Sequence, residues 1–452
     1  MRTTPPIELY RATEHGFAVD RPSQGRFREP LDGPLPGGLT PVATPSTMDA
    51  MCGWYDHGDR TILLAHIPEA YWGEPMVLIG EGDTVWPAYA TGEHTFVRED
   101  GETFDLGGSG PFERSHRLHE SEVEFEAGGV TLAGTLITPA GPGPFPAAVM
   151  LHGAAGGQRD YQRIVADPVL KAGIAVLIYD KRGHGRSGGA PEPTIFDQAG
   201  AAQAALELLA RTPTIDARRR GLVGFSNGMW AAPMVTGRRT DVAFLAGGGA
   251  PGVSMAEAEV HRRTKVLRDA GVGADTLGIV EAVWRCVFRM AAMGVATDTD
   301  VDRLVELTAK LSTADDLNRY EIPDYVRQNP MLAPYPPAEV PAEAIAAMVT
   351  AEASPELAYA PAVDYARTRC PVFLQYGSND VSVPVTASVE AITAALPDAQ
   401  IRVYADLEHQ LNVAPRALAG LSYEEAQYLF HDFRFGAGVR EELTAWLRAT
   451  TA

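Results

Sequence analysis

The sequence predicts an α/β fold built around a doubly wound, mostly parallel β-sheet. Short runs of mostly apolar residues predict its strands, at 146–153, 174–180, 221–226, 242–248, 371–377 and 400–406. Continuous runs of this kind are typical of parallel strands buried on both faces of a sheet. Helical stretches at 159–172, 195–211 and 385–396 separate several of these strands. This alternation of strand and helix is the pattern of a doubly wound α/β sheet.

Four regions follow one another along the chain. Residues 1–118 are rich in Pro, Gly and turn pairs, and their short strand-like runs predict a small β-rich region. Residues 119–250 begin with an alternating hairpin around Gly128-Gly129 and form the first part of the sheet core. Residues 251–355 have helical apolar spacing, which predicts an inserted helical cap over the C-terminal edge of the sheet. Residues 356–452 then complete the core.

Composition excludes several classes of partner. The net charge is −20 and no basic run exceeds Arg218-Arg219-Arg220, so we expect no nucleic-acid binding. No apolar run approaches the roughly 18 residues of a membrane helix, so we expect no membrane association. The first ten residues lack the apolar stretch of a secretion signal, and the three cysteines are far apart. A reducing, cytoplasmic setting is therefore expected.

The segment GLVGFSNG at 221–228 places a serine between two glycines where a predicted strand ends. A serine hydroxyl becomes a nucleophile when a base removes its proton. A sharp GxSxG turn between strand and helix projects the hydroxyl, and small residues relieve the crowding of the backbone. We therefore expect Ser226 to be a nucleophile flanked by Gly224 and Gly228. For the pentapeptide alone, an ordinary strand–turn–helix connection is the alternative.

A glycine-rich loop, HGAAGG at 152–157, follows another predicted strand. Its backbone N–H groups can stabilise an oxyanion together with the N–H of the residue after the nucleophile. The expected donors are the amides of Ala154 and Asn227. A glycine-rich turn needed only for its conformation is the alternative.

Asp380 and His409 each lie just past the end of a predicted strand, and both follow Ser226 in the chain. The order Ser, acid, His matches a catalytic triad on this kind of sheet. His409 is then the general base, and the Asp380 carboxylate orients its ring and stabilises its cation.

Three other residues compete for these roles. Asp406 and Glu408 lie close to His409, and Asp406 is too near it in sequence to be the preferred orienting acid. His431 lies some distance past the last predicted strand. We expect it to be a surface or core residue.

In chain order, strand-HG, strand-DKRGHGRS and strand-GxSxG resemble the α/β-hydrolase superfamily. The resemblance covers about 119–250 and 356–452. EVEFEAGGVTLAGTLITPAGPGPFPAAVMLHG and the serine turn look like the dienelactone-hydrolase and prolyl-oligopeptidase-related branch. That resemblance implies a cofactor-free serine hydrolase of esters, with peptides as substrates in some members, and a structural role for His184.

Two features depart from that branch. Asn227 stands where Gln, Glu, Met or Leu is commoner after the nucleophile. Residues 1–118 are too few to form the β-propeller of true oligopeptidases, which disfavours a size-gated peptidase.

The sequence thus predicts a hydrolase of a small to medium ester or related acyl substrate, without cofactor or metal. An acyltransferase or elimination enzyme of secondary metabolism and an aminoacyl or peptide hydrolase are alternatives. A non-catalytic binding protein would not require all three triad residues. Trp284 and Phe288 could line a substrate pocket, although packing against neighbouring helices is the favoured interpretation for each. Residues 1–118 could form a homodimer, cover the active-site mouth or pad the sheet edge.

Overall fold

The computed structural model describes residues 10–13, 16–19, 47–67, 76–98, 101–107, 110–154, 157–191, 194–269, 271–312, 347, 353–413 and 433–452. Its central feature is an eight-stranded sheet in the order β10-β11-β13-β12-β14-β15-β16-β17. The strands in that order are β10 (Leu118–Ala127), β11 (Val130–Pro139), β13 (Ala175–Tyr179), β12 (Phe145–Leu151), β14 (Ile215–Phe225), β15 (Phe244–Gly248), β16 (Val372–Gly377) and β17 (Gln400–Tyr404).

The sheet is parallel except at one side. β10 and β11 form an antiparallel hairpin, and β11 also runs antiparallel to β13. All other neighbours, from β13 across to β17, are parallel. The six predicted core strands and the hairpin are therefore confirmed. β12, β13, β15 and β16 are buried along most of their length because helices cover both faces.

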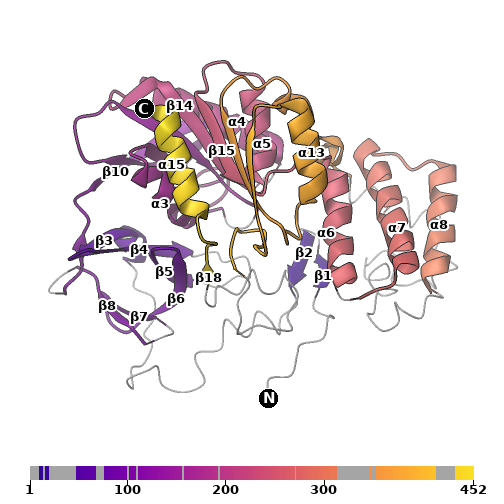
Figure 1. Cartoon of the computed structure of the whole chain (residues 1–452), viewed down its shortest axis with the longest axis horizontal. Helices are drawn as coiled ribbons and strands as arrows, with labels where there is room; N and C mark the ends of the chain where they lie inside the picture. Colours follow the sequence, from indigo (N-terminus) through magenta and orange to yellow (C-terminus); the bar gives the residue numbers. More distant parts are fainter. Residues whose placement is uncertain are drawn as a thin grey trace.

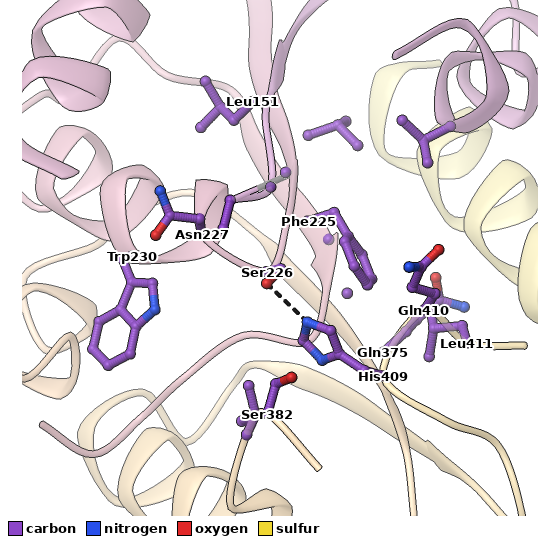
Figure 2. A pocket seen from close by; sticks show the side chains of 18 of the residues that line it. Leu151, Phe225, Ser226, Asn227, Trp230, Gln375, Ser382, His409, Gln410 and Leu411 are labelled. Atoms are coloured by element: carbon purple, nitrogen blue, oxygen red, sulfur yellow. Dashed lines mark hydrogen bonds between the residues drawn. The ribbon is translucent and has the colours of Figure 1, made fainter. Parts of the chain in front are cut away.

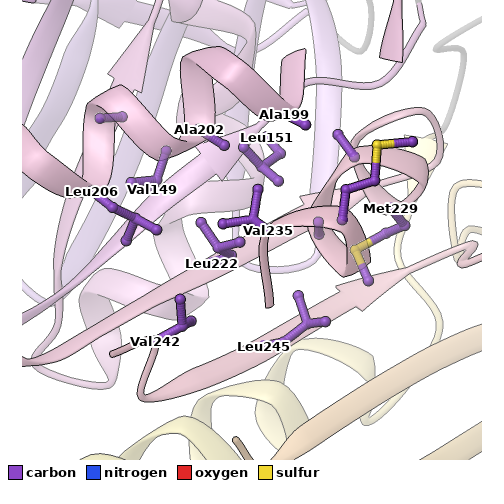
Figure 3. Close-up of a cluster of buried hydrophobic side chains, with 14 of the residues drawn as sticks. Val149, Leu151, Ala199, Ala202, Leu206, Leu222, Met229, Val235, Val242 and Leu245 are labelled. Carbon is purple, nitrogen blue, oxygen red and sulfur yellow. The ribbon is translucent and has the colours of Figure 1, made fainter. Parts of the chain in front are cut away.

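Helices form a layer on each face of this sheet (Figure 1). On one face lie α4 (Ile195–Arg211), α5 (Gly228–Thr236), α13 (Val385–Ala395) and the short α12 (Ala362–Tyr365). The other face carries η3 (Arg159–Tyr161), α3 (Gln162–Lys171) and α15 (Val439–Thr451). Figure 3 shows the first layer, where Leu206 of α4 and Val235 of α5 pack among Val149, Leu222 and Leu245 of the strands.

The N-terminal region forms a second, antiparallel sheet in the order β8-β7-β6-β5-β4-β3-β9, which confirms a β-rich region. Its elements are α2 (Met48–Met51), β3 (Gly53–His57), β4 (Arg60–Ile67), β5 (Met76–Glu81), β6 (Thr84–Ala90), β7 (Thr95–Arg98), β8 (Thr103–Asp105) and β9 (Glu113–Arg114). A separate hairpin joins β1 (Tyr10–Thr13) and β2 (Gly16–Val19).

This sheet is apolar on both faces because it has a core of its own and also docks onto the central sheet. One face packs Ile62, Leu64 and Phe96 into a separate buried cluster. The other presents Trp54 and Leu78 to the layer of α3 and α15. The Trp54 indole N–H donates to Asp167 of α3 at 3.1 Å. This hydrogen bond links the N-terminal sheet to the helix layer of the central sheet.

The described part of the predicted insertion contains α6 (Met255–Asp269), α7 (Ala274–Met293) and α8 (Asp298–Ser312). They pack on one another through a separate apolar cluster, and η5 (Pro355–Ala358) leads the chain back to the core. α7 ends at Gly294, whose φ of +63° is the left-handed conformation that terminates many helices. In Figure 1 these helices lie on the opposite side of the core from β3–β8. The Pro-rich stretch at 329–341 lies outside the described residues.

Candidate active site

Ser226 lies in the tight turn between β14 and α5. Its φ is +51°, a conformation that costs a non-glycine residue free energy and is found where function or packing requires it. Its backbone N–H donates to Gly248 at 3.0 Å, and its carbonyl accepts from Met229 at 2.8 Å. The turn is thus held between β15 and the first residues of α5, and the hydroxyl projects from the end of β14.

Both flanking glycines are closely packed, and at Gly228 the nearest atoms include backbone that cannot move aside. A Cβ atom at Gly228 would lie 2.8 Å from both the Cβ and the carbonyl oxygen of Leu151 on β12. A Cβ at Gly224 would lie 2.8 Å from Sδ of Met229. The glycines therefore permit the approach of α5 to β12 and β14 that creates the turn.

Ser226, His409 and Asp380 form one hydrogen-bonded line. His409 Nε2 lies 2.8 Å from Ser226 Oγ, and His409 Nδ1 lies 2.8 Å from Asp380 Oδ2. Asp380 is 1% exposed, and its other oxygen accepts the backbone N–H groups of Ser382 and Val383 at 2.8 Å. Figure 2 shows the His409 ring directed at the serine hydroxyl. The structure thus brings together the three residues expected from sequence, across 183 positions from serine to histidine.

The competing residues lie elsewhere. Asp406 is exposed, and Glu408, although buried, bonds to Asn412 through its side chain at 3.2 Å. Burial raises the pKa of Glu408 to about 7. His184 Nδ1 lies 3.0 Å from the carbonyl of Arg182, within its own loop. His431 lies outside the described residues.

Ala154 and Asn227 line the same pocket as Ser226. Within the described part of the chain, neither of their backbone N–H groups has a hydrogen-bond acceptor. Gln198 of α4 connects the two segments, because its side chain donates to the carbonyl of His152 at 2.7 Å and accepts from the Asn227 side chain at 3.3 Å. The two amides are therefore available to a ligand, and both border the serine turn.

Ser226, His409 and the two amides line a pocket of about 580 Å³. In Figure 2, Trp230 and Asn227 lie on one side of Ser226, with Gln410 and Leu411 on the other. The pocket lining is mostly apolar and includes the serine turn, helices α6 and α7, the face of α3 and α15, and Val85 of the N-terminal sheet. The pocket is thus shared between the central core and both additional regions.

The two pocket residues expected from sequence have different positions. Phe288 of α7 lines the pocket. Trp284, in contrast, is not among the described lining residues and stacks on Phe288 at a centroid distance of 5.4 Å. Arg263 packs against the Trp284 ring at 3.9 Å and contacts Glu259. Trp284 therefore supports the pocket wall from behind instead of forming it.

Three residues near the site were not identified from sequence as functional. Gln198 lies within an ordinary helical pattern, and Val85 within a short strand of a region of unknown role. Lys181 occupies the DKRGHG segment, and its ammonium lies 2.7 Å from the carbonyl oxygen of Gly153. No local signal marks Gln198 or Val85. Lys181 could have been singled out, because the chain has only four lysines and this one lies at the end of a predicted strand.

The strand order of the central sheet, the antiparallel hairpin at its edge and the serine at the end of β14 together define an α/β-hydrolase fold. The chain is an α/β-hydrolase by fold. More particularly, residues 115–243 match the family model of FrsA-like esterases. The match spans the first half of the core, including Ser226, and supports a hydrolase. No curated protein matches this sequence.

Solved structures with a similar arrangement include hydrolases of different kinds. A 2,6-dihydroxy-pseudo-oxynicotine hydrolase is 16% identical, with a TM-score of 0.40 over 74% of this chain and 68% of its own. A Pyrococcus furiosus esterase is 18% identical, with a TM-score of 0.37 over 65% and 85%. A proline iminopeptidase of Mycobacterium smegmatis is 17% identical, with a TM-score of 0.41 over 73% and 99%. Similarities at this level say nothing about the substrate.

No helix in the described part of the chain is both long and apolar enough to cross a membrane.

Proposed function

We propose that this protein is a serine hydrolase that cleaves carboxylic esters or closely related acyl bonds. The observation that carries the proposal is the continuous hydrogen-bonded line from Asp380 through His409 to Ser226. A serine flanked in this way by an imidazole and a buried carboxylate is the arrangement that activates a hydroxyl for attack on a carbonyl.

In the first half-reaction, His409 Nε2 takes the hydroxyl proton as Ser226 Oγ bonds to the carbonyl carbon. The electron pair of the C=O bond moves to oxygen, where the N–H groups of Ala154 and Asn227 stabilise the charge. The intermediate then re-forms the C=O bond and expels the alcohol, which takes the proton from His409. Asp380 stabilises the imidazolium throughout without itself becoming protonated.

In the second half-reaction, water gives a proton to His409 and bonds to the acyl carbon. The second tetrahedral intermediate uses the same two amides. Its collapse breaks the bond to Ser226 Oγ, which recovers the proton from His409, and the carboxylic acid leaves. The cycle consumes one water and requires no redox partner.

The mostly apolar lining supports an ester with a sizeable apolar group. Val85, Ile164, Phe435 and Leu443 form the wall nearest the N-terminal sheet, and all are at least nine-tenths buried. Burying apolar substrate surface there would contribute about 25 cal/mol per Å². Three arginines in the lining are paired with carboxylates: Arg262 and Arg263 with Glu259, and Arg440 with Asp167.

Labelling with a fluorophosphonate tests the proposal directly. The wild-type protein should be labelled once, on Ser226, and Ser226→Ala should not be labelled. Ser388→Ala is a matched control, because Ser388 is fully buried in α13, outside the pocket lining. Labelling that persists in Ser226→Ala, with circular dichroism unchanged, would refute the assignment.

A further inference from the structure

Lys181 binds both ends of the glycine-rich loop beside Ser226. Its ammonium group donates to the carbonyl oxygens of Gly153 at 2.7 Å and Ala154 at 3.2 Å. Its backbone N–H donates to the carbonyl of Gly157 at 2.7 Å. Lys181 lies two residues after the end of β13, so the strand that neighbours β12 in the central sheet positions this side chain against the loop.

The contact with Gly153 fixes the direction of one particular amide. The carbonyl of Gly153 and the N–H of Ala154 belong to the same planar peptide group, in which they point in opposite directions. An ammonium ion on the carbonyl side therefore holds the N–H on the other side. It also draws electron density from the peptide, which strengthens that N–H as a hydrogen-bond donor.

We propose that Lys181 is a positioning residue that orients and polarises the Ala154 amide for the oxyanion of the acyl-transfer intermediates. This inference rests on the proposed function, since it assigns a role within that reaction. Lys181 does not touch the substrate; it acts through the peptide group that does.

The surroundings of Lys181 make its charge responsive to pH. Burial lowers the pKa of its ammonium group to about 8. Nearby titratable groups are His152, whose pKa burial lowers to about 3, and His184 and Asp180 on its own loop. The Asp180 carboxylate accepts the backbone N–H groups of Arg159 and Arg186 instead of pairing with Lys181. Lys181 is therefore a cation at neutral pH, and the cation is lost above about pH 8.

Lys181→Met tests the inference through kinetics. Removing an oxyanion donor outright typically lowers kcat by about 100- to 1000-fold. Loss of its positioning contact should lower kcat/KM for a p-nitrophenyl ester by about tenfold or more, mainly through kcat. Lys171→Met is the matched control, because Lys171 is 57% exposed and pairs with Asp167 on α3. It should retain the wild-type rate.

A trifluoromethyl ketone separates this role from a merely structural one. Ser226 adds to such a ketone and places an oxyanion between the same amides. Its inhibition constant should rise in Lys181→Met in proportion to the loss of kcat/KM, whereas KM stays near the wild-type value. The inference is overturned if the ketone binds Lys181→Met as tightly as wild type.

The pH profile provides a second variant and a second readout. The wild-type rate should fall to a lower plateau as pH rises through about 8, because the Lys181 ammonium deprotonates there. Lys181→Arg keeps its charge in that range and should lose this step even if Lys181→Met does not fold. A step that persists unchanged in Lys181→Arg would overturn the inference. If wild type is not labelled by the fluorophosphonate at Ser226, the proposed function fails first, and the two failures are distinguishable.

Discussion

The backbone N–H of Phe435 donates a hydrogen bond to the carbonyl oxygen of Asp83 at 2.8 Å. This contact follows β18 (Phe433–Arg434), which pairs antiparallel with β6 of the N-terminal sheet. Phe435 also forms a β-bridge with Asn412, whose carbonyl accepts from Glu408 at 3.0 Å. The segment that carries His409 is therefore tied to a sheet formed by the first quarter of the chain. We infer that the N-terminal region supports the site, a role that sequence left open.

The first prediction concerns Val85, through which that sheet reaches the pocket. Val85→Ala enlarges the pocket at its apolar wall. For longer p-nitrophenyl esters, kcat/KM should therefore rise about 3- to 10-fold relative to the acetate. Val77→Ala is the control, because Val77 lies on neighbouring β5 and packs into the separate cluster of the N-terminal sheet. Chain-length profiles that are the same in both variants would show that this wall does not select substrates.

The second prediction concerns the serine turn. Gly228→Ala places a Cβ 2.8 Å from both the backbone and the side chain of Leu151, where little can move. The free energy of unfolding should therefore fall by about 1–3 kcal/mol. Urea denaturation at fixed pH measures this difference.

Gly278→Ala should instead raise the free energy of unfolding. Gly278 lies inside α7, and a Cβ there would meet nothing within 4 Å. Alanine should stabilise that helix by about 0.5–1 kcal/mol. A Gly228→Ala protein as stable as wild type would contradict the packing account of the GxSxG turn.

The third prediction concerns Glu408, the buried carboxyl next to His409. Burial raises its pKa from 4.5 to about 7, so the folded protein retains a proton that the unfolded chain has lost. The contribution of Glu408 to the free energy of unfolding is therefore largest below about pH 4.5. It is lost as pH rises through about 7. The loss amounts to at most about 3 kcal/mol.

Urea titrations from pH 4.5 to 8 measure this dependence. Glu408→Gln carries no titrating group and should remove the fall in unfolding free energy over this range. Glu113→Gln, an exposed carboxyl on β9, should leave the fall in place. A pH dependence identical in Glu408→Gln and wild type would rule out Glu408 as its source.

Sequence was most informative where one segment satisfies a local requirement. Continuous apolar runs identified the core strands because a strand covered on both faces needs apolar side chains on both. Gly228 could be recognised because a side chain at that position would collide with Leu151 where α5 approaches β12. Asp380 and His409 could be placed because parallel strands end at one edge of the sheet.

Sequence was least informative where distant segments meet through single side chains. Trp284 and Phe288 are equivalent in sequence, four residues apart on one helix, yet only Phe288 is found among the described lining residues. Helical spacing predicts on which face of a helix a residue lies. It does not predict which residues of that face a pocket reaches. The ammonium of Lys181 and the amide of Gln198 likewise depend on how far a side chain reaches across a completed fold.

The sequence by itself determined the strand and helix order, the serine turn and the chain order of Ser226, Asp380 and His409, the proposed nucleophile, acid and base. These follow from burial and backbone sterics, which act between near neighbours along the chain. Tertiary structure alone decided that β18 joins the N-terminal sheet, that Val85 reaches the pocket and that Lys181 holds the loop beside Ser226. Those contacts depend on the relative placement of whole layers, which no local pattern specifies.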